Sequence, residues 1–301
     1  MTKSRGSVLG WLLGSHRKYK WIWMLVPSFV VLGVFFLTPL ARLLQIAFFR
    51  YDPIWIYRPE VTLDNFSKFF RDVYFLKMIY NTLKVGFLST ICTLAVAYPI
   101  AYYLALCKPR ERTVLSAGFI GGLFVTMLVT TLGWYILFLP FGLIQQTLKA
   151  IGLSDGPVRL LKTFPALIAV LTHLHMPYAI LVLAASIQSV PKEKTNAARI
   201  LGAPTWKVFT HVLLPLTMPG VVSSAVLVFA LSASSYLVPI LITGQSIALL
   251  PIGVWRYTHE LLNWPFAAVT ALILFALTMS ASYGFIALTN RLSRRGKWEI
   301  V

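Results

Sequence analysis

Long apolar runs separated by short polar segments dominate the pattern along the chain. Six regions are free of Asp, Glu, Lys and Arg apart from a single Glu260 in the last: 21–41, 85–107, 113–148, 163–191, 208–255 and 257–290. A helix needs about 20 apolar residues to cross the hydrocarbon core of a bilayer. The pattern therefore predicts six transmembrane helices, at 22–47, 80–106, 114–139, 164–187, 219–242 and 265–289.

Helix breakers set two of these boundaries. The sequence Pro140-Phe141-Gly142 is predicted to end the third span. The run 208–255 is long enough for two crossings, but breakers interrupt it at Pro215, Pro219, Gly220, Pro239, Gly244 and Pro251. We expect one span there, at 219–242, followed by a re-entrant or surface segment over 243–255.

Composition supports a membrane protein over every soluble class. Hydrophobic residues make up 58% of the 301 residues and charged residues 12%, against about 25% charged in ordinary soluble domains. The net charge of +18 would suggest nucleic acid binding in a soluble protein, but here the basic residues flank apolar runs. The predicted fold class is an all-α polytopic membrane protein, with no nucleic acid partner.

The distribution of Lys and Arg predicts the orientation in the membrane. Segments 1–20, 107–113, 188–218 and 291–301 hold 16 of these residues, and the opposite set, 48–79, 140–163 and 243–264, holds 9. Basic loops stay in the cytoplasm, so both termini are expected there. The expected domains are a cytoplasmic segment 1–20, retained as part of an anchor, a six-helix domain 21–290 and a basic tail 291–301.

The inner loop 190–215 carries the most specific pattern. It predicts two short helices, about 192–201 and 204–213, broken at Gly202-Ala203-Pro204. Ala197, Ala198 and Leu201 share one small, apolar face of the first helix. From these features alone, the loop is either an amphipathic segment on the membrane surface or a surface for another protein.

The spacing of this loop resembles the EAA loop of permease subunits of ABC importers. That motif has Glu-Ala-Ala, three residues, Gly, nine residues, an aliphatic residue, one more and then Leu-Pro. Ala197-Ala198, Gly202, Val212 and Leu214-Pro215 fit each spacing, and Asn196 stands at the Glu position. The resemblance implies a type I ABC importer permease fold and a loop that couples to an ATPase through Asn196, Ala197, Ala198, Leu201, Gly202, Ala203, Val212, Leu214 and Pro215.

The same resemblance implies partners and a location. We expect a second and different permease chain, two ATPase subunits that hold ATP and Mg, and a periplasmic solute-binding protein that contacts 48–79 and 140–163. The chain itself is expected to bind no cofactor, to catalyse no reaction and to lie in the bacterial inner membrane.

Three further segments resemble the spermidine/putrescine, PotB-like subfamily: Thr62-Leu-Asp-Asn-Phe66, Pro215-Leu-Thr-Met-Pro-Gly220 and Asn263-Trp-Pro-Phe-Ala-Ala268. This subfamily implies a polyamine as the solute. Its members usually carry an Arg where this chain has Thr130, which leaves room for a related amine or amino compound.

Polar and aromatic side chains within the predicted spans are candidates for the solute passage. Each is more simply a helix–helix hydrogen bond, but as a set they can pass an organic cation through weak cation–π contacts. The candidates are Thr130, Thr131, Trp134, Tyr135, His175, Tyr178, Ser235 and Tyr236. His173 and His175 point about 200° apart on a helix, so no metal site is expected.

The absence of a P-loop sequence, G-x-x-x-x-G-K-[ST], indicates that ATP binds elsewhere. The main alternative is a secondary transporter driven by an ion gradient, and the lack of carboxylates in the span centres counts against it. A membrane enzyme would need a polar catalytic cluster, and a non-transporting assembly factor would leave the loop spacing without a cause.

Overall fold

The computed structural model describes residues 25–152, 159–244 and 246–295, and the predicted segment 1–20 lies outside them. Five helices of the described residues are long and apolar enough to cross a membrane. They are Leu25–Ala47, which contains the π-helical turn η1 (Gly33–Leu37) and α2 (Thr38–Ala47), α4 (Val73–Leu106), α8 (Phe164–Gln188), Thr205–Ser234, and α14 (Trp264–Arg295) with its apolar part at Trp264–Thr289. A sixth crossing is formed by two shorter helices, as the next paragraph describes.

The third predicted span is not a straight helix. α5 (Pro109–Leu123) and α6 (Met127–Leu137) meet at an angle of 91°. The bend falls at Thr126, whose extended backbone and side chain cap α6, with Oγ1 accepting a hydrogen bond from Val129 N at 3.4 Å. A continuous apolar run gives no sign of this cap beyond a single threonine.

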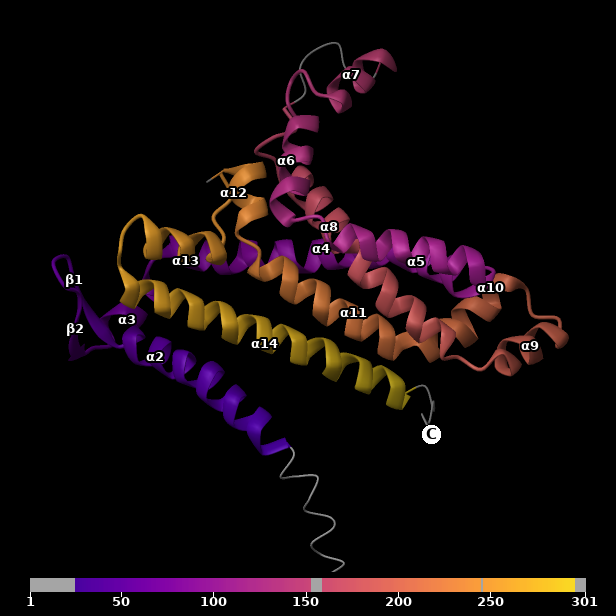
Figure 1. The fold of residues 1–301 in the computed structure, drawn as a ribbon, viewed down its shortest axis with the longest axis horizontal. Helices are drawn as coiled ribbons and strands as arrows, with labels where there is room; N and C mark the ends of the chain where they lie inside the picture. The colour runs from indigo at the N-terminus through magenta and orange to yellow at the C-terminus, as the bar shows by residue number, and fades with distance from the viewer. Residues whose placement is uncertain (1–24, 153–158, 245, 296–301) are drawn as a thin grey trace, which may run out of the picture.

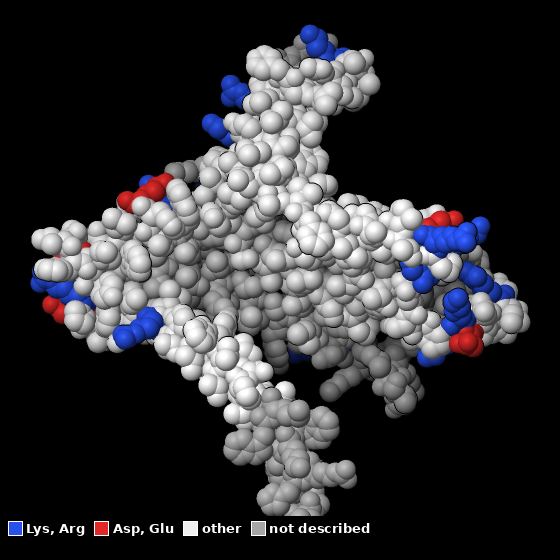
Figure 2. Space-filling model, viewed as in Figure 1, with Lys and Arg blue, Asp and Glu red and all other residues white. Residues whose placement is uncertain are grey.

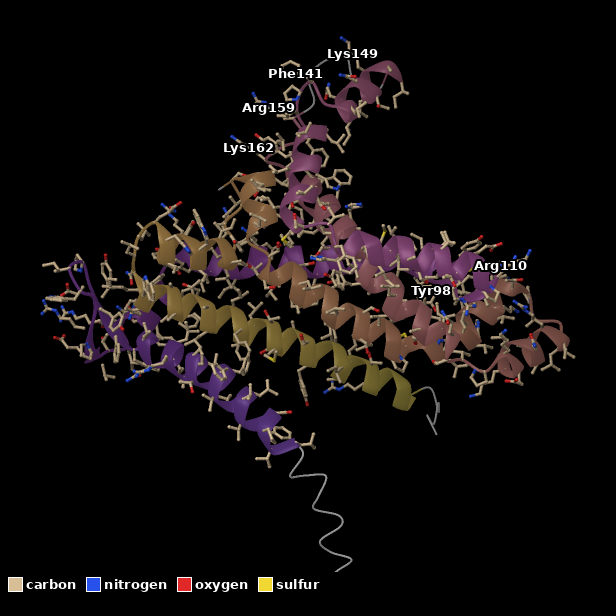
Figure 3. The ribbon with its side chains drawn as sticks, viewed as in Figure 1. Tyr98, Arg110, Phe141, Lys149, Arg159 and Lys162 are labelled. Atoms are coloured by element: carbon tan, nitrogen blue, oxygen red, sulfur yellow. The ribbon has the colours of Figure 1, made fainter. Side chains whose placement is uncertain are left out.

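Beyond the bend, α6 leaves the bundle. It packs against α12 (Leu237–Thr243) and leads into α7 (Leu143–Ala150), so that α6 and α7 project sideways (Figure 1). Three basic residues of the predicted outer loop, Lys149, Arg159 and Lys162, lie on this projection (Figure 3).

The fifth predicted span is shifted toward the N-terminus. The helix runs over Thr205–Ser234 and comprises α10 (Thr205–Val208), the π-helical turn η2 (Phe209–Leu213) and α11 (Leu214–Ser234). The expected separate helix at 204–213 is therefore the start of this span. A proline ring clashes with the carbonyl four residues earlier, which for Pro215 lies inside the widened turn η2, so the turn accommodates the proline and the helix continues.

The segment 243–255 does not lie on a surface. α12 ends at Gly244, which has φ of +61°, and a short loop leads to α13 (Leu250–His259). Leu249 and Leu250 are buried, and α13 packs against α14 and α4. Packing of this helix, which its prolines and short length hide, corrects the prediction of a re-entrant or surface segment.

A small β-hairpin follows the first span, which the sequence pattern did not predict. β1 (Phe49–Asp52) pairs antiparallel with β2 (Ile56–Val61), and α3 (Asp64–Arg71) packs beneath them. Asn65 joins these parts because its buried side chain donates to the carbonyl oxygens of Ala47, at 3.2 Å, and Phe49, at 2.9 Å.

The core of the bundle is formed by α4, α8 and α11, which pack against one another. Small residues allow this contact: a Cβ at Gly86 would lie 2.6 Å from the ring of Phe229. Polar pairs add to it, including Tyr98 and Thr217, whose hydroxyl oxygens lie 2.7 Å apart. The hairpin and the helix α9 (Lys192–Ile200) lie at opposite ends of this bundle (Figure 1).

Charged side chains separate in the same way. Figure 2 shows Lys, Arg, Asp and Glu at the two ends of the bundle and on the projection, with an uncharged belt between the ends. Arg110 lies at the α9 end (Figure 3). This distribution fits an apolar belt in lipid with the predicted inner loops together at one end.

Candidate functional site

The helix α9 is a short, separate element of the inner loop. It starts after Pro191 and ends in a Schellman motif. Gly202 has φ of +81° and donates its N–H to Arg199 O at 2.9 Å, while Ala203 donates to Ala198 O at 3.1 Å. The sequence predicted the break at Gly202, and the left-handed backbone explains why glycine stands there.

The end of α9 presents large apolar side chains to the surroundings. Leu201 and its neighbour Ile200 are each 86% exposed, and Trp206 is 61% exposed. Ala197 is exposed on the same short helix, which has no buried residue. Sequence reasoning missed Ile200, although an isoleucine in a helix of otherwise polar and small residues was a usable signal.

The predicted coupling residues fall into two groups. Asn196, Ala197, Ala198, Leu201, Gly202 and Ala203 lie on α9 and its terminal turn, whereas Val212, Leu214 and Pro215 are half-buried in η2 and α11. The second group belongs to the transmembrane helix itself. The loop therefore places an exposed tip on a continuous helix into the bundle, which can transmit a push on the tip.

Arg112 fixes the neighbouring turn between α4 and α5. Its guanidinium donates to the carbonyl oxygens of Leu104, at 3.2 Å, Ala105, at 2.8 Å, and Cys107, at 3.4 Å. A further bond, at 3.3 Å, reaches the side-chain oxygen of Gln188 at the end of α8. These bonds satisfy the free carbonyls at the end of α4 and join it to α8. No sequence feature marked Arg112 among its basic neighbours.

Three of the passage candidates lie inside the chain. Thr131 is fully buried and donates to Met127 O at 2.7 Å, Ser235 is buried, and the Nδ1 of buried His175 lies 2.9 Å from Ser232 Oγ. These side chains face neighbouring helices of the same chain, which is the helix–helix alternative that the sequence left open.

The remaining candidates lie nearer the surface. Tyr135, Tyr178 and Tyr236 are exposed, and Thr130 and Trp134 are half-buried. Trp134 Nε1 donates to His173 Nδ1 at 3.1 Å, so His173 and His175 have different partners on different sides of α8. The described residues contain no group of three or more His, Cys, Asp or Glu that could hold a metal ion.

A comparison with protein families identifies the class of protein to which this fold and loop belong. Residues 6–294 match the family described as binding-protein-dependent transport system inner membrane component. The chain belongs to this family, and it is a multi-pass permease subunit of an ABC importer rather than an enzyme.

Curated relatives are similar over most of the chain. The spermidine/putrescine transport system permease protein PotB of Haemophilus influenzae is 28% identical, covering 91% of this chain and 93% of the relative. The PotB protein of Escherichia coli K12 is 26% identical, covering 89% and 90%. The trehalose transport system permease protein SugB of Mycobacterium tuberculosis is 28% identical over 66% of each chain.

Solved structures support the fold. A bacterial ABC transporter involved in the import of the acidic polysaccharide alginate matches with a TM-score of 0.75 and 18% identity, covering 94% of this chain and 99% of the other. The MetNI methionine ABC transporter matches with a TM-score of 0.54 and 17% identity, covering 74% and 95%. The six-crossing architecture, including the bent pair, is therefore that of type I importer permeases.

Proposed function

We propose that this chain forms, with a second and different permease chain, the passage through which a polyamine or related amine or amino compound enters the cell. Two ATPase subunits that bind ATP and Mg drive the movement, and a periplasmic binding protein delivers the solute. The observation that carries the proposal is the exposed, glycine-terminated helix α9, joined to a transmembrane helix at the end of the bundle.

The tip of α9 is the proposed contact with an ATPase. Ile200 and Leu201 give an apolar anchor of the kind that protein interfaces bury. Because Thr205–Ser234 is one helix, motion of the tip is carried into the bundle core through η2 and α11. Asn196 contributes no charge to this contact, so its salt dependence should be weak.

The proposed passage uses the surface of this chain rather than its interior. Tyr135, Tyr178 and Tyr236 are exposed and would face the second permease chain, with Trp134 beside them. Aromatic faces attract an organic cation weakly, which suits a solute that must also leave. We assign Thr131, His175 and Ser235 to packing within the chain.

The amine is proposed from the PotB relatives, and it fits a passage lined with aromatic and hydroxyl groups. The experiment is uptake into proteoliposomes that contain the complete complex, with labelled putrescine, spermidine and trehalose compared side by side. We expect ATP-dependent uptake of an amine that competes with unlabelled amines. Uptake of trehalose alone would contradict the proposed solute and leave the importer intact.

A second arm separates the importer from a secondary transporter. ATP is withheld in one sample, and an ionophore collapses the ion gradients in another. The importer requires ATP and is insensitive to the ionophore. Uptake that needs the gradient and not ATP would overturn the mechanism.

A further inference from the structure

A cleft of about 370 Å³ lies between α9, the neighbouring ends of α4 and α8, and the start of α10. One face of α9 lines it through Lys192, Thr195, Asn196 and Arg199, which follow helical spacing. Ile200 and Leu201, on the proposed ATPase contact, do not line it. The cleft is thus a separate surface of the same loop.

The charged groups of the cleft all have one sign. Arg112, Lys192 and Arg199 line it, and no Asp or Glu does. Arg112 is held in place by its bonds to the end of α4, whereas Lys192 and Arg199 form no ion pair within the part of the chain that the structure describes. An anion in the cleft would meet three cations from two helices, together with the amide of Asn196.

The rest of the wall is apolar. Tyr102, Leu106 and Phe209 line the side formed by the transmembrane helices. Leu106 is 57% exposed at the last turn of α4, where the uncharged belt meets the basic end of the bundle. Cations at the rim and apolar side chains below them match a molecule with an anionic head and a hydrocarbon tail.

We propose that this cleft binds the phosphate group of an anionic phospholipid of the cytoplasmic leaflet. The phosphate lies between Lys192, Arg199 and Asn196, and an acyl chain lies along Leu106 and Phe209. Arg and Lys bind phosphate oxygens through charge-assisted hydrogen bonds. The inference uses the inward orientation of the loop and does not depend on the solute or on the ATPase contact.

The test is native mass spectrometry of the full-length chain in a mild nonionic detergent, titrated with phosphatidylglycerol or with phosphatidylcholine. We expect tighter binding of phosphatidylglycerol. The variants Lys192→Gln and Arg199→Gln should each weaken it roughly fivefold, as expected for the loss of one cation near a lipid surface. Asn196→Glu, which places a carboxylate in the cleft, should weaken it at least as much.

Two matched controls keep the result specific. Lys194→Gln removes the same charge from the same helix but outside the cleft, and Asn196→Gln keeps the amide. Both should bind phosphatidylglycerol like the unchanged chain. Equal weakening by Lys194→Gln and Lys192→Gln would overturn the proposal, because it would show attraction by overall charge.

The source of the phosphate is tested in the same instrument. Inorganic phosphate, added in excess, should neither bind the cleft stably nor displace the lipid, and displacement would show a free-phosphate site instead. The assembled complex with its ATPase subunits should retain the lipid. Loss of lipid on assembly would show that an ATPase side chain fills the cleft, which would also overturn the proposal.

Discussion

Gly220 of α11 lies directly against Ser186 of α8. A Cβ added at position 220 would overlap both the Cβ and the Oγ of Ser186. The two helices therefore approach at a point where only glycine fits, as small residues commonly permit between membrane helices. This contact lies just beyond Pro219, inside the fifth span, so the same Pro-Gly pair that reads as a helix boundary is a packing position.

Replacing Gly220 with Val should separate α8 from α11 and destabilise the chain by about 1–3 kcal/mol, the usual cost of overpacking. Thermal unfolding in detergent measures the effect. Gly284→Val is the matched control, because Gly284 is also helical and a Cβ there meets nothing within 4 Å. Equal loss in both variants would mean that helix propensity, not the contact with Ser186, sets the cost.

Gly202→Val should uncouple ATP hydrolysis from uptake in the reconstituted complex. A Cβ at this position meets nothing within 4 Å, so the effect comes from the backbone, where φ of +81° costs an L-residue about 1–2 kcal/mol. Gly202→Asn is the control, since asparagine tolerates left-handed backbone. Normal coupling in the Val variant would remove the terminal turn of α9 from the mechanism.

Arg112→Gln should loosen the turn between α4 and α5. The variant leaves the carbonyl oxygens of Leu104 and Ala105 without a charged donor, at about 1.5–3 kcal/mol per such bond. Hydrogen exchange of the amides over 107–113 should rise. Arg110→Gln changes the same charge on the same helix, where Arg110 forms no bond or ion pair with the described residues, and should leave exchange unchanged.

Asp52 should make the β-hairpin sensitive to acid. Its carboxylate accepts from the backbone N–H groups of Trp55, at 3.0 Å, and Ile54, at 2.8 Å, and pairs with Arg58. These backbone hydrogen bonds, with a smaller contribution from Arg58, hold the pKa of Asp52 below its ordinary value. A lowered pKa stabilises the fold above the ordinary carboxyl range, and the gain is lost as pH falls through the lowered pKa, below about pH 4.

The amides of residues 54 and 55 report this loss as falling protection against hydrogen exchange, after correction for the intrinsic effect of pH. Asp52→Asn keeps an acceptor but cannot ionise, so it should start less protected at neutral pH and show little further change with acid. An unchanged acid response in Asp52→Asn would assign the transition to another group.

The sequence by itself determined the class of protein and its most specific loop. Apolar runs of span length can only be covered by lipid, which predicts crossings without knowledge of packing. The break at Gly202 was also predictable, because a left-handed turn after a short helix selects glycine over every residue with a Cβ. The helix α9 was expected at 192–201 and is found at Lys192–Ile200.

Tertiary structure alone decided how those spans run and what each side chain faces. Pro219 lies within a helix because lipid and neighbouring helices make a break costlier than a proline. His175 is buried and Tyr178, three residues later on α8, is exposed. In water, the hydrophobic pattern marks the inner face of a helix. In a membrane, lipid and protein interior are equally apolar, so the pattern does not separate these two faces, and only packing does.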